Sequence, residues 1–100
     1  MQGIAVLGST GSIGKQTLEV IEQFPDRLQA VSLVAGTNFK LLAQQIKKYH
    51  PKIAVIAKEE LLTPLKALVG ETKTILLAGE AGIKEAIAIS EVTIVVAAIS

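Results

Sequence analysis

The stretch that decides the fold is residues 4–18, IAVLGSTGSIGKQTL. An apolar run, residues 4–7, ends in a loop whose glycines recur every third residue, at Gly8, Gly11 and Gly14. A helical pattern begins as this glycine loop (residues 8–14) ends, so the stretch predicts a strand, a tight turn and a helix N-terminus. Glycines allow a ligand to approach the backbone closely, and free N–H groups at a helix N-terminus attract anions. We therefore predict an anion site, which in a β-α-β unit usually holds a pyrophosphate.

Two other interpretations compete with this one. The glycines follow G-x-x-G-x-x-G, a relative of the dinucleotide fingerprint G-x-G-x-x-G, with Ser9 at the first position of that frame. Gly14 and Lys15 suggest instead a mononucleotide P-loop, G-x-x-x-x-G-K-[ST], but this would require a glycine at Ser9 and a hydroxyl at Gln16. A glycine-rich turn without a ligand is the third interpretation. The motif favours a dinucleotide.

Composition limits the class of protein. Half of the residues are hydrophobic and the mean hydropathy is +0.51, which fits a single α/β domain whose parallel sheet is covered on both faces. The net charge is +1 and only three residues are aromatic, so the sequence does not predict a nucleic-acid surface. There is no cysteine and no signal-peptide pattern, and the apolar stretch at 92–99 is too short to span a bilayer. We expect a cytoplasmic protein without a membrane partner.

Strand and helix patterns alternate along the whole chain. After the first strand, further strands are expected at 30–35, 53–57, 74–77 and 93–99. The first helix should bury one apolar face, and the second should run from a cap at Asn38 to the His50-Pro51 pair. The apolar positions of the first helix are Ile13, Thr17, Leu18, Val20, Ile21 and Phe24. A third helix begins at either Glu59 or Pro64, and a fourth spans 81–89.

This alternation predicts a doubly wound parallel sheet of at least five strands, a Rossmann-like dinucleotide-binding domain of the α/β class. Residues 92–99 are apolar enough for a central strand, and the chain ends where the site should continue. We therefore expect residues 1–100 to be an incomplete N-terminal dinucleotide-binding domain, without the catalytic and C-terminal domains. A small complete binding module is the alternative.

The end of the second strand indicates which cofactor binds. NAD-binding domains usually carry Asp or Glu there, about 20 residues after the glycines. This chain has Gly36, Thr37 and Asn38 instead, and residues 27–58 contain no Asp or Glu. A carboxylate would repel a 2′-phosphate, whereas Thr and Asn donors near Lys40 would hold it, so NADP is favoured. Asn38 is equally well explained as a helix cap, and the two roles can coexist.

Other polar residues are less suited to chemistry. His50 precedes a proline on the side of the sheet away from the glycine loop, so geometry argues against it as an acid or base for that site. Thr10 and Ser12 lie in the glycine loop without a histidine partner, so we interpret them as phosphate donors and not as nucleophiles. Lys47, Lys48 and Lys52 are expected to be surface charges.

Three motifs together resemble one family. GSTGSIG at 8–14, VAG-x-N at 34–38 and AAI at 97–99 resemble the N-terminal NADPH-binding domain of 1-deoxy-D-xylulose 5-phosphate reductoisomerase. The resemblance implies that one set of residues contacts the cofactor phosphates and the adjoining sugar, while a second set lines the adenosine end. The first set is Thr10, Gly11, Ser12 and Ile13, and the second is Gly36, Thr37 and Asn38. Family members often have a basic residue at the position of Thr37, so Lys40 is the candidate substitute.

The resemblance also implies a reaction. The family rearranges 1-deoxy-D-xylulose 5-phosphate, a phosphorylated sugar, and reduces it with NADPH to 2-C-methyl-D-erythritol 4-phosphate for non-mevalonate isoprenoid synthesis. A divalent Mg or Mn ion acts as a Lewis acid there, held by carboxylates beyond residue 100, and the full-length protein is expected to be a homodimer. By this interpretation residues 1–100 are inactive alone. The alternatives are the cofactor domain of another NADP-dependent reductase, of the semialdehyde dehydrogenase type, and a non-catalytic nucleotide-binding module.

Overall fold

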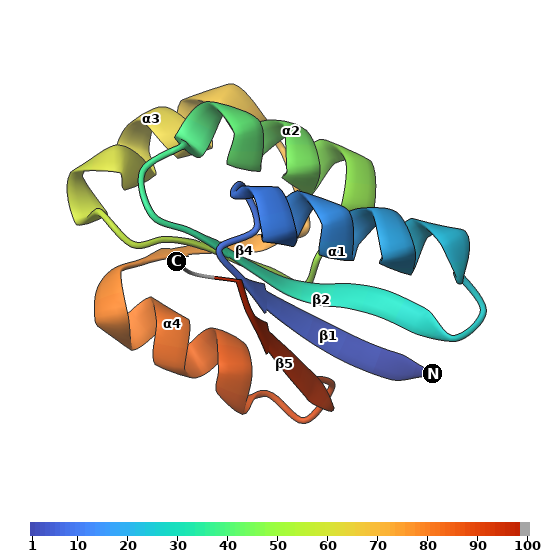
Figure 1. The fold of residues 1–100 in the computed structure, drawn as a ribbon. Coiled ribbons are helices and arrows are strands. Elements are labelled where there is room, and N and C mark those ends of the chain that lie inside the picture. The colour runs from blue at the N-terminus through green and yellow to red at the C-terminus, as the bar shows by residue number, and fades with distance from the viewer. Residues whose placement is uncertain (99–100) are drawn as a thin grey trace.

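Five strands form one parallel sheet in the computed structural model, which describes residues 1–98 (Figure 1). The strands are β1 (Gln2–Leu7), β2 (Leu28–Ala35), β3 (Ile53–Ile56), β4 (Ile75–Ala78) and β5 (Ile94–Ala97). The helices are α1 (Ser12–Gln23), α2 (Phe39–Tyr49), α3 (Leu62–Val69) and α4 (Gly79–Ala88), with a 3-10 turn, η1 (Glu59–Leu61), before α3. The predicted α/β alternation is confirmed.

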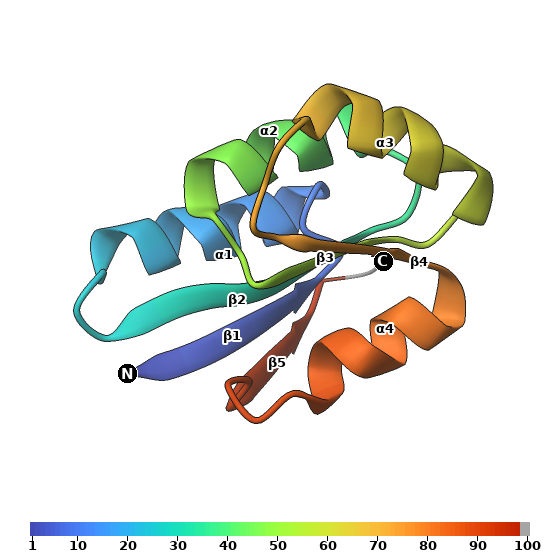
Figure 2. The same cartoon turned by 180° about the vertical axis from the view of Figure 1, so that it is seen from behind.

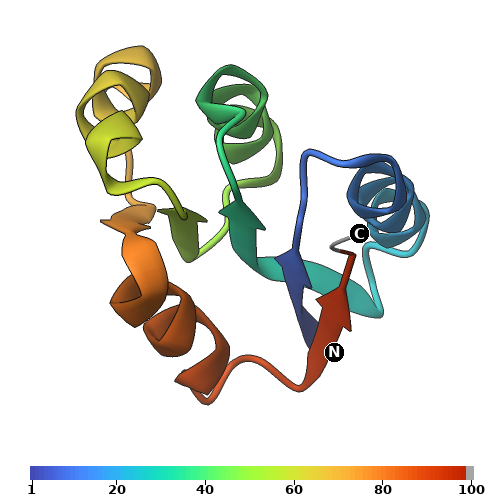
Figure 3. The same cartoon turned by 60° about the vertical axis from the view of Figure 1, so that its left-hand side comes forward.

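The strand order, β4-β3-β2-β1-β5, determines where the helices lie. The first three crossovers step along the sheet in one direction, and α1, α2 and α3 cover the same face (Figures 1 and 2). The connection from β4 returns across the sheet to β5, and a right-handed crossover in that direction places α4 on the opposite face, as Figure 3 shows. The sheet is therefore doubly wound, with its switch point between the carboxyl ends of β1 and β5.

The two faces of the sheet have unequal cores. Beneath α1, α2 and α3 lie large aliphatic side chains, of which Leu18, Leu33, Leu42, Ile46, Ile56 and Leu65 are at most 1% exposed. Burial of each such side chain stabilises the fold by about 1.5–3 kcal/mol. On the other face α4 packs closely on Val34, Ile53 and Val55 through the small residue Ala86. A Cβ at Gly82 would lie 2.9 Å from Leu77 Cβ, so this helix approaches the sheet through glycine as well.

The buried face of α1 differs from the prediction. Gly14, Leu18 and Ile21 are buried, at the spacing of one helical stripe. The expected members Ile13, Val20 and Phe24 are instead 60%, 47% and 47% exposed. The reason is that the stripe is centred on Gly14, where the helix lies against the loop, and these three residues fall beside it.

The last strand lies beside β1. Within residues 1–98, β5 pairs with β1 and with no other strand, so the expectation of a central strand stays a prediction about the complete domain. Its residues Ile94 and Val95 are exposed because α4 packs against β2, β3 and β4. The expected continuation of the strand to Ile99, and the loop after it, lie outside the described residues.

The two expected starts of the third helix both coincide with structural features. The 3-10 turn before α3 starts at Glu59, and Pro64 falls in the first turn of α3.

Candidate nucleotide-binding site

The glycine loop leaves β1 and folds over the end of β2. Gly8 adopts a φ of 89°, a conformation that favours glycine. The backbone amides of Gly8 and Ser9 both donate to the Val34 carbonyl, at 2.7 and 3.0 Å, and the Gly11 amide donates to the Gly8 carbonyl at 3.2 Å. These bonds fix the turn at the carboxyl edge of the sheet, as predicted.

A buried polar pair anchors the loop to α2. The Ser9 hydroxyl donates to Gln45 Oε1 at 2.8 Å, and Gln45 Nε2 donates to the Ser9 carbonyl at 2.8 Å. Both residues are buried, so the side chain of Ser9 has a structural role and does not face a ligand. Sequence reasoning missed this pair. The available signal was Gln45, a polar residue between the buried Ala43 and Ile46 on the apolar face of its helix.

The remaining two glycines of the loop serve different purposes. A Cβ at Gly14 would lie 2.0 Å from the Gly8 carbonyl oxygen and 2.7 Å from Ser9 Cα, so the helix can approach the loop only with glycine there. A Cβ at Gly11 would lie 3.6 Å from the Gly8 carbonyl oxygen and 3.9 Å from that of Ala98, which is ordinary contact. The backbone therefore does not require glycine at residue 11. The glycine instead leaves space beside the loop, at the cavity described below.

The start of α1 provides free hydrogen-bond donors. Gly11 is the N-cap residue, and it offers no side-chain cap to the first turn. Within residues 1–98 the backbone amides of Thr10, Ser12 and Ile13 have no backbone acceptor, since the helical ladder begins with Lys15 donating to the Gly11 carbonyl at 2.9 Å. The Ser9 amide is already bonded to β2 and is not available to a ligand. The donor set therefore begins at Thr10, at the positive end of the helix dipole.

A cavity of about 250 Å³ lies beside these donors. It opens at the carboxyl ends of β1, β2, β3 and β5, on the side of the switch point where ligands bind in such sheets. Its lining consists almost entirely of small residues, so much of its surface is backbone: Gly8, Gly11, Val34, Ala35, Gly36, Ala57, Ile83 and Ala98. The volume is below the roughly 300–1,000 Å³ of complete ligand pockets, so the cavity accommodates part of an extended ligand.

The β2–α2 loop forms the second half of the site. Gly36 lines the cavity, and apart from its chain neighbours no atom of residues 1–98 lies within 4 Å of the place a Cβ would take there. Asn38 is the predicted cap, because its Oδ1 accepts from the Leu41 amide at 3.1 Å. The Thr37 carbonyl accepts from the Phe39 amide at 2.8 Å, which tightens the turn. Thr37 and Asn38 thus follow Gly36 at the rim and are not among the residues that line the cavity.

Two residues considered from the sequence lie elsewhere. Lys40 is on the outer side of α2, beside Gln44, Lys47 and Leu68, and not at the cavity. His50 lies at the amino-terminal edge of the sheet, as predicted. In residues 1–98 no three His, Cys, Asp or Glu side chains gather closely enough to hold a metal ion. Every helix in that part of the chain is too short or too polar to span a bilayer.

A doubly wound parallel sheet, a glycine turn into a helix N-terminus and a cavity at the switch point define a nucleotide-binding domain of the Rossmann class. Residues 4–100 match the sequence model of 1-deoxy-D-xylulose 5-phosphate reductoisomerase, so the chain belongs to that family. The resemblance seen in the three motifs is therefore confirmed.

Individual relatives agree with this assignment. The chain is 48% identical over 87 residues to the 1-deoxy-D-xylulose 5-phosphate reductoisomerase of Nostoc punctiforme, covering 85% of this chain and 22% of that one. To the enzyme of Acaryochloris marina it is 44% identical over 101 residues, covering 99% of this chain and 25% of the relative. The chain thus spans about a quarter of the length of these curated relatives.

Solved structures of the same enzyme have the same fold. The Zymomonas mobilis reductoisomerase in complex with NADPH matches with a TM-score of 0.83 and 38% identity, over 90% of this chain and 24% of that one. A reductoisomerase in complex with magnesium matches with a TM-score of 0.93 and 33% identity, over 99% of this chain and 25% of that one. A further match is a complex with NADPH, fosmidomycin and magnesium, with a TM-score of 0.91 and 33% identity over 99% of this chain and 24% of that one.

Proposed function

We propose that this chain is the NADPH-binding part of a 1-deoxy-D-xylulose 5-phosphate reductoisomerase. The observation that carries the proposal is the arrangement of free amides at Thr10, Ser12 and Ile13 beside a glycine-lined cavity at the switch point. Such amides suit a pyrophosphate, because they are fixed donors at the positive end of a helix dipole. The family match and the NADPH complex of the Zymomonas mobilis relative support the same cofactor.

The residues of this chain would hold and orient the cofactor. The amides and hydroxyls of Thr10 and Ser12, with the amide of Ile13, bind the pyrophosphate, and Gly11 leaves room for it. Gly36, Thr37 and Asn38 border the adenosine end. NADPH, when bound, supplies a hydride. Binding by rigid backbone donors fixes the orientation of the dinucleotide along the sheet edge, which is the contribution of this domain to the reaction.

The whole protein would carry out the family's reaction, in which 1-deoxy-D-xylulose 5-phosphate is rearranged and reduced to 2-C-methyl-D-erythritol 4-phosphate. By the family resemblance, the phosphorylated sugar and the divalent metal would be held by the catalytic and C-terminal domains. The family match gives no support to the semialdehyde dehydrogenase alternative. Isolated residues 1–100 are accordingly expected to bind NADPH and to lack turnover.

Substitution of Gly11 tests the proposal. Gly11→Val in the protein that carries this domain should weaken NADPH binding at least about tenfold, because the branched side chain occupies the space of the pyrophosphate. Gly11→Ala should have an intermediate effect. Both variants should keep their fold, because the nearest atom to a Cβ at this position lies 3.6 Å away, and circular dichroism and denaturant unfolding will check this. An unchanged dissociation constant in a folded Gly11→Val variant would refute the site.

A further inference from the structure

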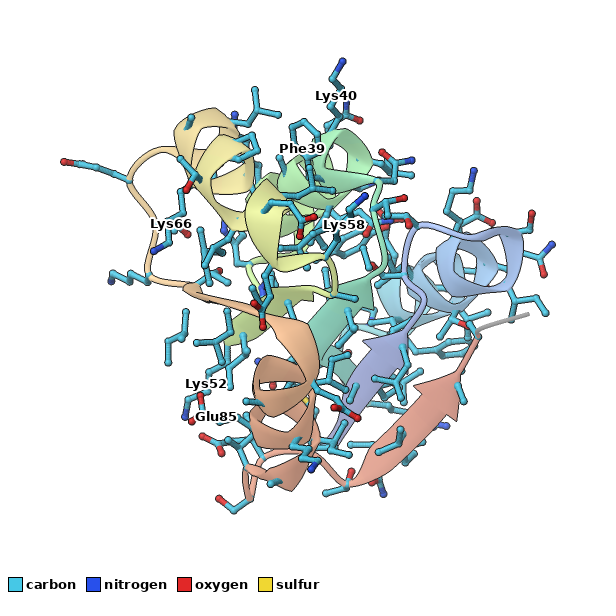
Figure 4. The ribbon with its side chains drawn as sticks, turned by 90° about the vertical axis from the view of Figure 1, so that its left-hand side faces the viewer. Phe39, Lys40, Lys52, Lys58, Lys66 and Glu85 are labelled. Carbon is cyan, nitrogen blue, oxygen red and sulfur yellow. The ribbon has the colours of Figure 1, made fainter. Side chains whose placement is uncertain are left out.

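The 2′-phosphate that distinguishes NADPH from NADH needs a cationic partner, and Thr37 does not supply one. Lys40 was the expected substitute. In the structure its neighbours are Gln44, Lys47 and Leu68, in the shallow depression between α2 and α3. Figure 4 shows Lys40 projecting outward from α2, away from the sheet. The position of Lys40 therefore does not suit an adenosine ribose bound at the end of β2.

Another lysine approaches the same loop from the neighbouring strand. Lys58 follows the end of β3, and its backbone amide donates to the Gly36 carbonyl at 3.2 Å. The residue before it, Ala57, lines the cavity and donates to the Ala35 carbonyl at 2.8 Å. Lys58, labelled in Figure 4, thus starts at the rim of the cavity, beside the β2–α2 loop.

The Lys58 side chain is available for a ligand. Its residue is exposed, and the ion pairs found in residues 1–98, Lys48 with Glu22 and Lys52 with Glu91, do not involve it. The adjacent acid, Glu59, is turned toward the start of α4: a Cβ on Gly79 would lie 2.5 Å from its Oε1. The carboxylate of Glu59 is therefore directed to α4, and no ion pair found in residues 1–98 holds the ammonium group of Lys58.

We propose that Lys58 is the specificity-determining residue that binds the 2′-phosphate of NADPH. This inference rests on the proposed function of the domain and adds the residue that selects the phosphorylated cofactor. An ammonium group on a flexible stem can follow a phosphate at the rim of an open site, and the bond it forms is charge-assisted. NADH lacks this phosphate, so its affinity does not depend on Lys58.

The test compares Lys58→Ala with Lys40→Ala in the protein that carries this domain. Dissociation constants are measured for NADPH and NADH, and for 2′,5′-ADP and 5′-AMP, which report on the adenosine end alone. Lys58→Ala should weaken NADPH and 2′,5′-ADP about tenfold, in line with loss of a hydrogen bond to a charged group, and should leave NADH and 5′-AMP within about twofold. Lys58→Arg should keep the preference, Lys58→Glu should remove it, and Lys40→Ala should change neither cofactor.

The outcomes separate the inference from the proposed function. A Lys58→Ala variant with the wild-type ratio of NADPH to NADH affinity overturns the inference and leaves the function intact. An equal loss of affinity for NADPH and NADH in that variant also overturns it, because Lys58 then supports the local structure at the cavity and does not select the 2′-phosphate. A wild-type protein that binds neither NADPH nor 2′,5′-ADP refutes the proposed function itself.

Discussion

The two edges of the sheet differ in a way that separates a binding site from a surface hollow. At the carboxyl edge a cavity of about 250 Å³ is lined by glycines and other small residues. At the amino edge a larger one, about 540 Å³, is lined by charged residues that include Lys47, Lys52 and Lys73. Size and charge alone would favour the second. Backbone geometry favours the first, because only there do a positive-φ glycine, a helix N-terminus and the switch point coincide.

Several polar groups at the amino edge have partners or roles within the chain. The Thr74 hydroxyl donates to the Pro51 carbonyl at 2.7 Å, and Lys52 is paired with Glu91. His50 ends α2 in a left-handed conformation with φ of 50°, and its amide donates to the Ile46 carbonyl at 3.0 Å. These residues close helices and strands. At the carboxyl edge, by contrast, the free donors are backbone amides that cannot rotate away from a ligand.

The largest effect should come from Gly14→Ala. The added Cβ would meet the Gly8 carbonyl oxygen at 2.0 Å, so α1 must move away from the loop. We expect a loss of about 2–3 kcal/mol in the free energy of unfolding, as for an overpacked core position, measured by denaturant titration. Gly36→Ala is the matched control, since its Cβ has open space and should change stability by less than about 0.5 kcal/mol. Equal stability of the two variants would contradict the close approach of α1.

A smaller effect is expected from Ser9→Ala. This change leaves Gln45 Oε1 buried without its donor, which costs about 1–3 kcal/mol of stability. Because the loop also loses its tie to α2, NADPH binding should weaken in the same variant. Ser90→Ala serves as the control: its hydroxyl makes an exposed bond of 3.3 Å to Glu91 and should matter little. A stable Ser9→Ala protein with full NADPH affinity would show that the buried pair does not support the loop.

The lysines of the amino-edge cavity should not contribute to cofactor binding. Lys47→Ala combined with Lys73→Ala removes two of its cations, and the dissociation constant for NADPH should stay within about twofold at physiological salt, where exposed charges at a distance are screened. Isothermal titration calorimetry will measure this. A tenfold loss of NADPH affinity would show that the amino edge contributes to cofactor binding.

The smallest effect concerns Lys52→Ala. Hydrogen bonding from Lys52 lowers the pKa of the Glu91 carboxyl below its ordinary value. The pair therefore stabilises the fold above the ordinary carboxyl pKa, and this contribution is lost as the pH falls through the lowered pKa of the folded state. In the variant the pKa of Glu91 should rise toward its ordinary value, as followed by NMR titration, with little change in stability because both side chains are exposed. An unchanged pKa would mean that the pair does not form in solution.

Most of the fold followed from periodicity and turn residues. The glycine loop, the Asn38 cap and the stop at His50-Pro51 are local features, because residues close in sequence decide them. The errors depended on tertiary packing. Ile13 has the apolarity of a core residue, but its exposure depends on which side of Gly14 meets the loop. The place of β5 beside β1, and not beside β4, depends on strand order, which periodicity does not encode.

The candidate site was predictable to a similar degree. Spacing alone brought the glycine loop and Gly36 to one end of the sheet, because carboxyl ends of parallel strands share an edge. The Ser9–Gln45 pair and the approach of Lys58 to Gly36 join residues far apart in the chain, from different elements. No spacing rule connects them, so they became visible only once the strand order was known.

The Ser9–Gln45 pair has a consequence for protein engineering. Gln45 lies on α2, the helix that follows the β2–α2 loop, so the pair links the glycine loop to the β2–α2 loop through one helix. Transplanting the glycine loop into a foreign α/β scaffold would therefore fail unless a glutamine on the next helix travels with it. Conversely, replacing Ser9 and Gln45 together by two apolar residues should preserve packing while removing the link between the glycine loop and α2.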